Sequence, residues 1–265
     1  MVRRAKIWFI FFAITFFLGS LVMANSIEKR PEEKVPILVY HNIMDHYDPQ
    51  SSLVHISPVE FENHMISIRD AGFNTITFTD YYNYVVHGKP LPEKPIIITF
   101  DDGYYSNYEY AYPILKRLNM KATIFVITGR MGDKEVTFPH FGWEEAREMQ
   151  SSGVIDIQSH SNLHPVMTNL EEGRLQLELR RSKYLIEKEL GKPCEVFAYP
   201  YGMLNAYTQT AAQKAGYKIQ VKVGDKGVNT ANDGLMQLKR LTARGGTSGQ
   251  ELLDMIYQNL NEDVE

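Results

Sequence analysis

The sequence predicts an α/β fold: a distorted (β/α) TIM-like barrel of about seven or eight strands in a single domain. Short apolar runs rich in β-branched residues alternate with helical runs along most of the chain. Strands of this composition are typical of parallel sheets that are buried on both faces. About seven or eight such strand–helix units, with no internal repeat, favour a closed parallel barrel over an open sheet.

The expected strands span residues 35–40, 73–78, 95–100, 121–127, 153–158, 195–199, 217–223 and 235–241. The helices expected between and after them span residues 58–71, 107–118, 143–152, 171–190, 206–215 and 248–261. Ser57 and Glu60 have the spacing of a capping box, which supports the start of the first helix. The segment that ends at Leu190 is the clearest amphipathic helix, and Gly191 can end it.

Composition and charge exclude some classes of protein. Hydrophobic residues make up 44% of the 265 residues and charged residues 23%, which is ordinary for a globular protein. The formal net charge of −4 argues against nucleic acid as a partner, because phosphate binding needs a basic face. The single cysteine, Cys194, excludes an intramolecular disulfide and is expected to be a small buried side chain.

The N-terminus has the features of a targeting segment. Three basic residues precede an apolar run from Ile7 to Met23. This run is slightly short for a membrane span and long for a signal core, so residues 1–24 are expected to be a signal peptide or an N-terminal membrane anchor. Residues 25–34 are expected to form a linker and residues 35–265 the main domain. In either case that domain lies outside the cytoplasm, secreted or anchored to the outer face of the cytoplasmic membrane, because the basic residues stay inside.

Most polar residues that could carry chemistry directly follow an expected strand. The carboxyl ends of parallel strands meet at one rim of a barrel, where barrel enzymes place their active sites. The candidates at this rim are His41, Asp101, Asp102, His160, His164, Tyr201, Gly202, Arg240 and Arg244. The pattern therefore predicts one site to which several strands contribute.

Asp101 and Asp102 form the sharpest feature of this rim. Adjacent carboxylates repel each other unless something cationic lies nearby. Gly103 permits a sharp turn that exposes both side chains. One carboxylate could then bind a metal while the other accepts a proton from water. The alternative is a solvated turn, since Asp-Gly is a common turn pair.

His160 and His164 are four residues apart. On a helical turn this spacing places both imidazoles on one face, within reach of a single metal. Two histidines and one carboxylate leave coordination positions open for water and substrate, as in catalytic metal sites. The residues therefore predict a divalent metal as cofactor, for which zinc is the best match and cobalt, nickel and iron are alternatives.

Three motifs occur in the order TFDDGY (99–104), SHSNLH (159–164) and AYPYG (198–202). In this order they resemble the motifs of the polysaccharide deacetylases, carbohydrate esterase family 4, and the resemblance runs over about residues 35–260. The phrases VPILVYHNI and FAYPYG are most similar to the subgroup that de-N-acetylates poly-β-1,6-N-acetylglucosamine in biofilm matrices. The resemblance implies a hydrolase that removes N-acetyl groups from an extracellular N-acetylglucosamine polysaccharide and releases acetate, with residues 35–265 as its catalytic domain.

The resemblance also implies a role for each motif residue. Asp101 would be the general base that activates water. Asp102, His160 and His164 would be the metal ligands. The backbone N–H of Tyr201 would help to stabilise the oxyanion of the tetrahedral intermediate.

The chain departs from the family pattern in two places. Ala198 stands where the family has an arginine that orients the catalytic aspartate, and we expect Arg240 to approach the aspartate pair instead; the alternative is an ordinary surface arginine. No histidine follows His164, whereas the family has its acid histidine near the C-terminus. We expect His41 to protonate the leaving amine, because VYHN matches the Tyr-His that the biofilm subgroup carries near its N-terminus.

The same site residues are compatible with other substrates. Peptidoglycan, chitin oligomers and acetyl esters remain alternatives, because amide and ester carbonyls use the same metal, base and oxyanion site. A non-catalytic wall sugar-binding module is a further alternative, although binding alone needs no base beside a metal. The membrane is a second partner if the N-terminal segment is not cleaved. His140, in FPHFGW, could line a sugar groove or simply belong to a packed loop.

Overall fold

The computed structural model describes residues 33–224 and 226–261. The chain separates into two units, Met1–Pro31 and Glu32–Glu265, and the fold described below is that of the second unit. The expected signal peptide or anchor, residues 1–24, lies outside the described residues and stays a prediction. Within the described ranges, no helix is both long enough and apolar enough to cross a membrane.

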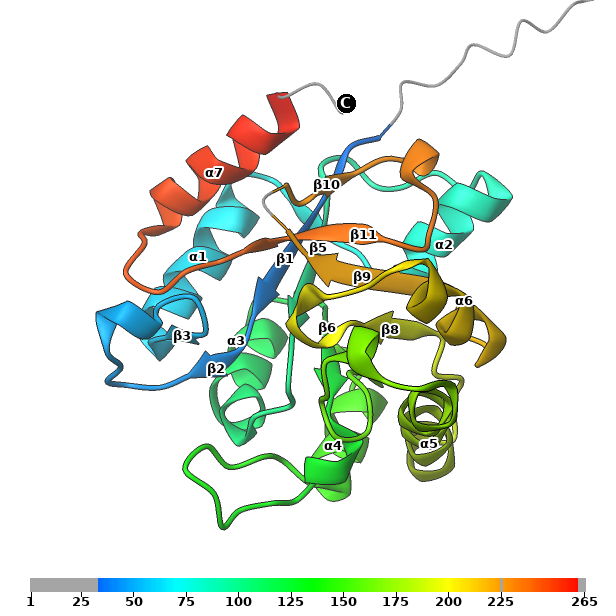
Figure 1. Cartoon of the computed structure of the whole chain (residues 1–265). Helices are drawn as coiled ribbons and strands as arrows, with labels where there is room; N and C mark the ends of the chain where they lie inside the picture. Colours follow the sequence, from blue (N-terminus) through cyan, green and yellow to red (C-terminus); the bar gives the residue numbers. More distant parts are fainter. Residues whose placement is uncertain (1–32, 225, 262–265) are drawn as a thin grey trace, which may run out of the picture. The chain divides into compact units, whose positions relative to one another are not determined.

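Seven parallel strands close into a barrel, which confirms the predicted fold class (Figure 1). β1 pairs with β5 on one side and with β11 on the other, and these two pairings close the barrel. In order around the barrel, the strands are β1 (Val35–Tyr40), β5 (Pro95–Phe100), β6 (Ala122–Val126), β7 (Ile155–Ser159), β8 (Val196–Ala198), β9 (Ile219–Val223) and β11 (Leu238–Thr242).

Short strands in the described part of the chain lie beside the barrel. β2 (Asn42–Ile43) pairs with β3 (His55–Ile56), β4 (Asn74–Thr75) pairs with the start of β5, and β10 (Val228–Asn229) pairs antiparallel with β1. None of them is part of the closed ring, which therefore has seven strands rather than eight.

The predicted strand 73–78 is wrong beyond its two β4 residues. The Thr77 hydroxyl accepts a hydrogen bond from the Asp80 amide (3.2 Å), and the Asp80 carboxylate accepts one from the Thr77 amide (2.9 Å). This capping box starts helix α2 (Phe78–His87), which the sequence analysis did not predict. Local capping therefore ends the strand after β4.

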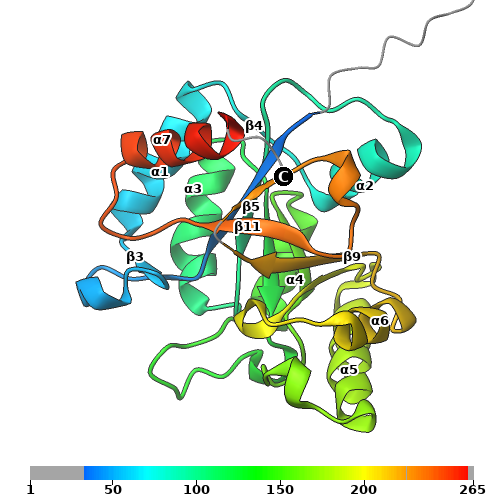
Figure 2. The ribbon, with the colours of Figure 1, turned by 45° about the horizontal axis from the view of Figure 1, so that its top comes forward.

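The helices surround the barrel, with α7 beside α1 and with α5 and α6 together on another side (Figures 1 and 2). Besides α2 they are α1 (Pro58–Asp70), α3 (Tyr112–Arg117), α4 (Trp143–Ser151), α5 (Glu172–Leu190), α6 (Ala206–Lys214) and α7 (Gly249–Asn261). A π-helix (Asn107–Ala111) precedes α3, so the predicted helix 107–118 forms with one irregular part. Short 3-10 helices span Pro49–Ser51, Thr128–Arg130, Met167–Asn169, Pro200–Gly202 and Ala231–Asp233.

The predicted start and end signals are present in the helices concerned. Ser57 and Glu60 form the expected capping box at α1. Gly191 ends α5 in the left-handed conformation, at φ 64°. Cys194 is fully buried, as expected. The two signals fix where α1 begins and where α5 ends relative to the strands.

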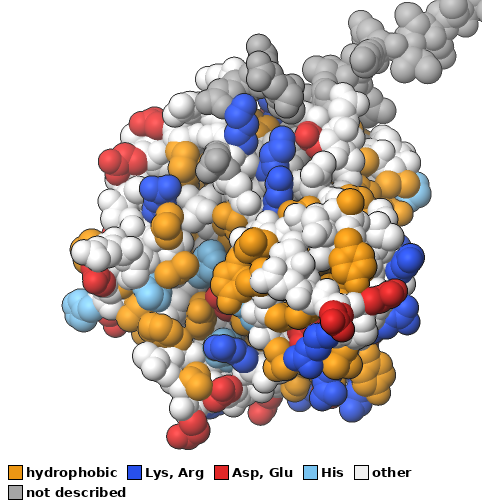
Figure 3. All heavy atoms as spheres, in the orientation of Figure 1, with side chains coloured by type: hydrophobic (Ala, Val, Ile, Leu, Met, Phe, Trp, Pro, Cys, Tyr) orange, Lys and Arg blue, Asp and Glu red, His pale blue; other side chains and the backbone are white. Residues whose placement is uncertain are grey.

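The core has two parts, as a barrel requires. One cluster contains alternate residues of the strands, such as Ile37 and Ile97, together with Phe78 and Tyr81 from α2. The other, larger cluster contains the remaining strand residues and the apolar faces of the surrounding helices. On the face seen in Figure 3, histidine side chains lie among hydrophobic ones over β2 and β3.

Candidate active site

The pairing of β1 with β5 places His41 and Asp101 at adjacent strand ends. Tyr40 lies opposite Phe100 in the parallel register, so the next residue of each strand is at the same level of the rim. The Asp101 amide donates a hydrogen bond to the Tyr40 carbonyl (3.0 Å), which extends the pairing by one residue. Two distant segments are thus joined at the start of the site.

Asp102, His160 and His164 converge as the sequence predicts, with potential ligand atoms that all lie within 4.8 Å of one another. The two histidine Nε2 atoms are 3.1 Å apart, and the Asp102 Oδ1 atom lies 3.6 Å and 3.5 Å from those of His160 and His164. Tetrahedral zinc, with bonds of about 2.0–2.2 Å, separates its ligand atoms by about 3.3–3.6 Å. Octahedral magnesium would bring adjacent ligands to about 2.9 Å. The three separations between the Asp102, His160 and His164 atoms are closer to those of a tetrahedral zinc site.

The orientation of His160 suits a metal ligand. Its side chain is buried, and its Nδ1 atom lies 2.9 Å from the Ala198 carbonyl oxygen. A carbonyl only accepts, so Nδ1 carries the proton and Nε2 presents its lone pair to Asp102 and His164. A backbone partner of this kind fixes the tautomer and the ring orientation of a metal-ligating histidine.

His164 is held in the neutral form. Burial, followed by the neighbouring His160, lowers the pKa of His164 to about 4. A metal binds the neutral imidazole, so this protonation state is the one that coordination requires. The Tyr201 ring lies 4.6 Å from the His164 ring, although the Tyr201 residue is 63% exposed. The oxyanion role of the Tyr201 N–H stays a prediction.

Arg240 approaches Asp101, which confirms the expected contact and makes the surface-arginine alternative wrong. The fully buried guanidinium donates from its two terminal nitrogens to the two Asp101 carboxylate oxygens, at 2.6 and 2.7 Å. It also donates to the Thr99 hydroxyl (3.2 Å) and the Lys222 carbonyl (3.4 Å). A bidentate pair of this type fixes the plane of the carboxylate.

The charge of Asp101 depends on this contact. Burial by itself would raise the pKa of Asp101, but Arg240 and then His160 hold it well below its usual range. The carboxylate therefore stays ionised, with its Oδ2 atom 3.8 Å from the His160 Nε2 atom. An ionised, oriented carboxylate beside the histidine pair can accept a proton from water.

His41 lies within electrostatic range of the same groups. Its Nδ1 atom is buried and has no hydrogen-bond partner among the described residues. Burial lowers the pKa of His41, while Asp101 and Asp102 raise it. The backbone is held in place, because the side-chain amide of Asn107 donates to the His41 carbonyl (2.8 Å). A buried ring nitrogen without a partner is free to bond to a substrate.

A family comparison agrees with this arrangement. The family model described as polysaccharide deacetylase matches residues 88–220. YxkH of Bacillus subtilis, which is assigned to the polysaccharide deacetylases, is 35% identical over 216 residues, 82% of this chain and 74% of that protein. The chain belongs to the polysaccharide deacetylase family. It is therefore a hydrolase, and the predicted family and enzyme class are confirmed.

Two further relatives extend the comparison. The poly-β-1,6-N-acetyl-D-glucosamine N-deacetylase of Staphylococcus aureus is 29% identical over 188 residues, which cover 67% of this chain and 64% of that protein. A Streptococcus pyogenes deacetylase solved with acetate superposes with a TM-score of 0.76 and 28% identity, covering 84% of this chain and 98% of that one. The barrel of this deacetylase thus matches nearly the whole length of the solved Streptococcus pyogenes deacetylase.

Backbone strain in the deacetylase gathers at this site. Of the six non-glycine residues with positive φ in the described ranges, four lie in the rim motifs: Asp102 (74°), Ser161 (70°), His164 (60°) and Tyr201 (59°). Each such residue costs about 1–3 kcal/mol and persists only where the surroundings enforce it. The local conformations that aim these residues are therefore maintained by contacts from elsewhere in the deacetylase.

A row of rings lies beside the Asp102, His160 and His164 cluster, and we call it the aromatic wall. It runs from Tyr47 to His55 (6.4 Å between ring centroids), Phe138 (5.2 Å), Tyr104 (6.2 Å) and His140 (5.1 Å). His140, for which a sugar groove and a packed loop were the alternatives, is buried against Tyr104, as a packed loop requires, whereas Tyr47, His55, Phe138 and Tyr104 are partly exposed. The wall is drawn from three separate segments of the deacetylase.

Electrostatic effects link the aromatic wall to the candidate site at the rim. The pKa of Tyr104 is raised first by burial and then by Asp102, and that of His55 is lowered first by burial and then by His41. The sequence analysis missed both residues. Tyr104 ends the TFDDGY motif and could have been included, whereas nothing in the sequence connects His55 to this rim. Arg244, also expected at the rim, is exposed, and its side chain makes no hydrogen bond or ion pair with the described residues.

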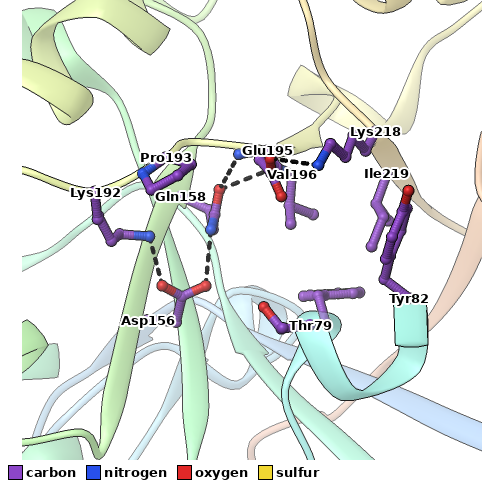
Figure 4. Close-up of a pocket in the computed structure, with 11 residues that line it drawn as sticks. Thr79, Tyr82, Asp156, Gln158, Lys192, Pro193, Glu195, Val196, Lys218 and Ile219 are labelled. Carbon is purple, nitrogen blue, oxygen red and sulfur yellow. Dashed lines mark hydrogen bonds and ion pairs between the residues drawn. The ribbon is translucent and has the colours of Figure 1, made fainter. Parts of the chain in front are cut away.

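A separate pocket of about 400 Å³ lies at the opposite, amino-terminal ends of β7, β8 and β9 (Figure 4). Its charged side chains pair with each other, Asp156 with Lys192 (2.5 Å) and Glu195 with Lys218 (2.7 Å). The Gln158 side-chain amide donates to the Asp156 carboxylate (2.8 Å) and accepts from the backbone N–H of Glu195 (3.0 Å). This end of a barrel contributes stability rather than catalysis, and the pocket takes no part in the candidate site.

Proposed function

We propose that this deacetylase removes N-acetyl groups from an extracellular N-acetylglucosamine polysaccharide in a reaction that depends on a divalent metal, and that it releases acetate. One observation carries the proposal. Asp102, His160 and His164 present ligand atoms at nearly the spacing of a tetrahedral metal site, and they lie beside the ionised, oriented Asp101 carboxylate. The name of the Staphylococcus aureus relative supports the choice of sugar polymer.

Asp102, His160 and His164 would hold the metal. Zinc best fits one carboxylate and two imidazoles at this spacing, and cobalt, nickel or iron accept the same ligands. When bound, the ion would polarise the acetyl carbonyl and lower the pKa of a water molecule. Three protein ligands leave positions open for that water and for the substrate.

Asp101 is proposed as the general base. Arg240 prevents its carboxylate from rotating and keeps it ionised, so it is ready to take a proton from the attacking water. Arg240 thereby fills the role of the family arginine that Ala198 replaces. Because the guanidinium comes from β11 rather than β8, the substitution preserves the contact while changing the strand that supplies it.

His41 is proposed as the general acid that protonates the leaving amine. Its lowered pKa makes it neutral in the free enzyme near pH 7, so it must first take up a proton from solvent, and negative charge that develops beside it favours that uptake. It then donates this proton to the leaving amine, while Asp101 returns the proton from water to solvent. The backbone N–H of Tyr201 is proposed to stabilise the oxyanion. The left-handed conformation of Tyr201 redirects its peptide groups at the turn after β8, next to the His164 ring.

The aromatic wall supports a sugar polymer as substrate. Partly exposed rings that border a catalytic centre offer flat apolar faces to sugar rings, with polar edges nearby. Peptidoglycan, chitin oligomers and acetyl esters share the same site chemistry and remain alternative substrates. A non-catalytic sugar-binding module would have no need for the buried Arg240–Asp101 pair beside the histidines.

The location is proposed from the N-terminal sequence. The basic residues before the apolar run indicate that residues 35–265, the proposed catalytic domain, lie outside the cytoplasm. The protein would then be secreted, or anchored to the outer face of the cytoplasmic membrane if the segment is not cleaved.

Acetate release from three polymers tests the proposal. The zinc-loaded protein is incubated with poly-β-1,6-N-acetylglucosamine, chitin oligomers and peptidoglycan at equal concentrations of N-acetyl groups. We expect the fastest release from the β-1,6-linked polymer. Faster release from chitin or peptidoglycan would make that polymer the substrate in place of the β-1,6-linked one. Release of acetate from none of them would overturn the proposed activity.

A further inference from the structure

A buried carboxylate lies beneath the segment that joins the two histidines. Glu178, on α5, is fully buried, and its Oε2 atom accepts hydrogen bonds from the backbone amides of Asn162 (3.0 Å) and Leu163 (2.7 Å). We propose that Glu178 is a positioning residue that sets the separation of His160 and His164. This inference rests on the proposed metal-dependent function.

The segment between the histidines needs such support. Ser161 and His164 both adopt positive φ, a conformation that L-residues rarely take. The turn forms few of the backbone hydrogen bonds that a helix would provide, so contacts from other segments must stabilise its conformation. The Ser161 hydroxyl accepts from the His164 amide (2.9 Å), which leaves the amides of Asn162 and Leu163 to find acceptors elsewhere.

A single oxygen of Glu178, Oε2, accepts both hydrogen bonds. A buried amide without a partner costs about 1–3 kcal/mol, and Asn162 is buried, so the bond from its amide, together with the bond from the Leu163 amide, keeps the turn in this conformation. Bonds to a charged acceptor are also stronger than bonds to a neutral one. The other oxygen, Oε1, pairs with Arg174 (2.9 Å), whose side chain is 47% exposed.

The opposite side of the segment is held by the connection after β6. The amides of Thr128 and Gly129 donate to the carbonyls of Ser161 (3.2 Å) and Asn162 (2.7 Å). The approach is close, since a Cβ atom on Gly129 would lie 2.6 Å from the Asn162 carbonyl oxygen. The segment is thus fixed from both sides, with its carbonyls on the β6 side and its amides on Glu178.

Packing does not explain a glutamate at this position. Glu178 lies on the buried face of α5 with Leu175, Leu179 and Ile186, where an apolar residue would avoid the cost of burying a charge. The carboxylate is accommodated because it bonds to the turn. Its effect on the site therefore passes through the geometry of His160 and His164.

Zinc affinity separates this role from a general structural one. Glu178→Leu keeps the volume and removes the acceptor, whereas Glu178→Gln keeps an acceptor oxygen. Arg174→Ala removes only the exposed ion-pair partner and is the matched control. Zinc affinity of the full chain is measured by competition with a chromophoric chelator, alongside thermal unfolding without metal. We expect Glu178→Leu to weaken zinc binding about 10–100-fold, Glu178→Gln to recover most of that loss, and Arg174→Ala to match the wild type.

Unchanged zinc affinity in Glu178→Leu would overturn the inference. If that variant does not fold, Glu178→Asp decides, because it keeps the charge but draws the carboxylate back from the two amides. We expect it to lose zinc affinity at least about tenfold, and wild-type affinity would overturn the inference equally. A wild-type protein that binds no zinc would contradict the proposed function itself, so the two failures are distinguishable.

Discussion

Replacing Arg240 with methionine is expected to leave Asp101 as a buried carboxylate without its main partner. Arg240 is fully buried and Asp101 is 2% exposed, so water cannot take the place of the guanidinium. Removing one partner of a buried ion pair costs about 3–5 kcal/mol, because an uncompensated charge remains. We therefore expect the free energy of unfolding to fall by about that amount in R240M. Methionine has a similar length, so little of the loss comes from a cavity.

Denaturant unfolding of the metal-free protein measures this loss, with R244M as the exposed-arginine control. The D101N variant and the D101N/R240M double variant complete a double-mutant cycle. We expect the double variant to be more stable than R240M alone, because a neutral amide is less costly to bury than a charge. Stability of R240M within about 0.5 kcal/mol of the wild type would refute the reasoning, since surface substitutions have effects of that size.

The pH dependence of stability gives a second check on the same pair. The folded-state pKa of Asp101 lies below that of the unfolded carboxyl, about 3.9, so the unfolded state binds the proton first. The stabilisation is complete above that pH and is lost as the pH falls toward the folded-state pKa. R240M raises the folded-state pKa, so this acid-side loss should disappear from its stability profile. An identical profile in both proteins would argue against the pair as its source.

Two further predictions concern turnover. H41A should lower kcat on the polymer by about 10²–10⁴, as loss of a general acid does, while zinc content stays unchanged; turnover like that of the wild type would exclude His41 as the acid. F138A should lower kcat/KM on N-acetylglucosamine oligomers about tenfold, equivalent to about 1.4 kcal/mol of lost stacking, but leave hydrolysis of a small acetyl ester unchanged. Y184A, at a 62% exposed tyrosine on α5, is the control, and equal losses on both substrates would contradict a sugar-binding role for the aromatic wall.

Strand ends explain why much of the site could be predicted. Asp101, Asp102 and His160 directly follow barrel strands, and a parallel barrel brings such positions to one rim whatever the exact packing. The Arg240 contact could be expected for a related reason. A buried carboxylate needs a cation, and the family pattern left the usual position, Ala198, without one.

Other features depend on contacts that a single sequence does not display. The early end of β4 and the helix α2 after it were missed because the Thr77–Asp80 capping box outweighed a β-branched run, although that box was visible as a signal. Glu178 was also detectable in principle, as a charge on the apolar face of an amphipathic helix. The aromatic wall was not detectable, because segments that are far apart in the sequence bring its rings together by packing.

The central claim is that Asp102, His160 and His164 hold a catalytic metal in this deacetylase. The most direct test measures zinc content together with acetate release from poly-β-1,6-N-acetylglucosamine, before chelation, after chelation and after zinc is returned. We predict about one zinc per chain, loss of acetate release on chelation and its recovery with zinc, with neither zinc nor activity in H164A. Undiminished acetate release from the metal-free protein would contradict the claim.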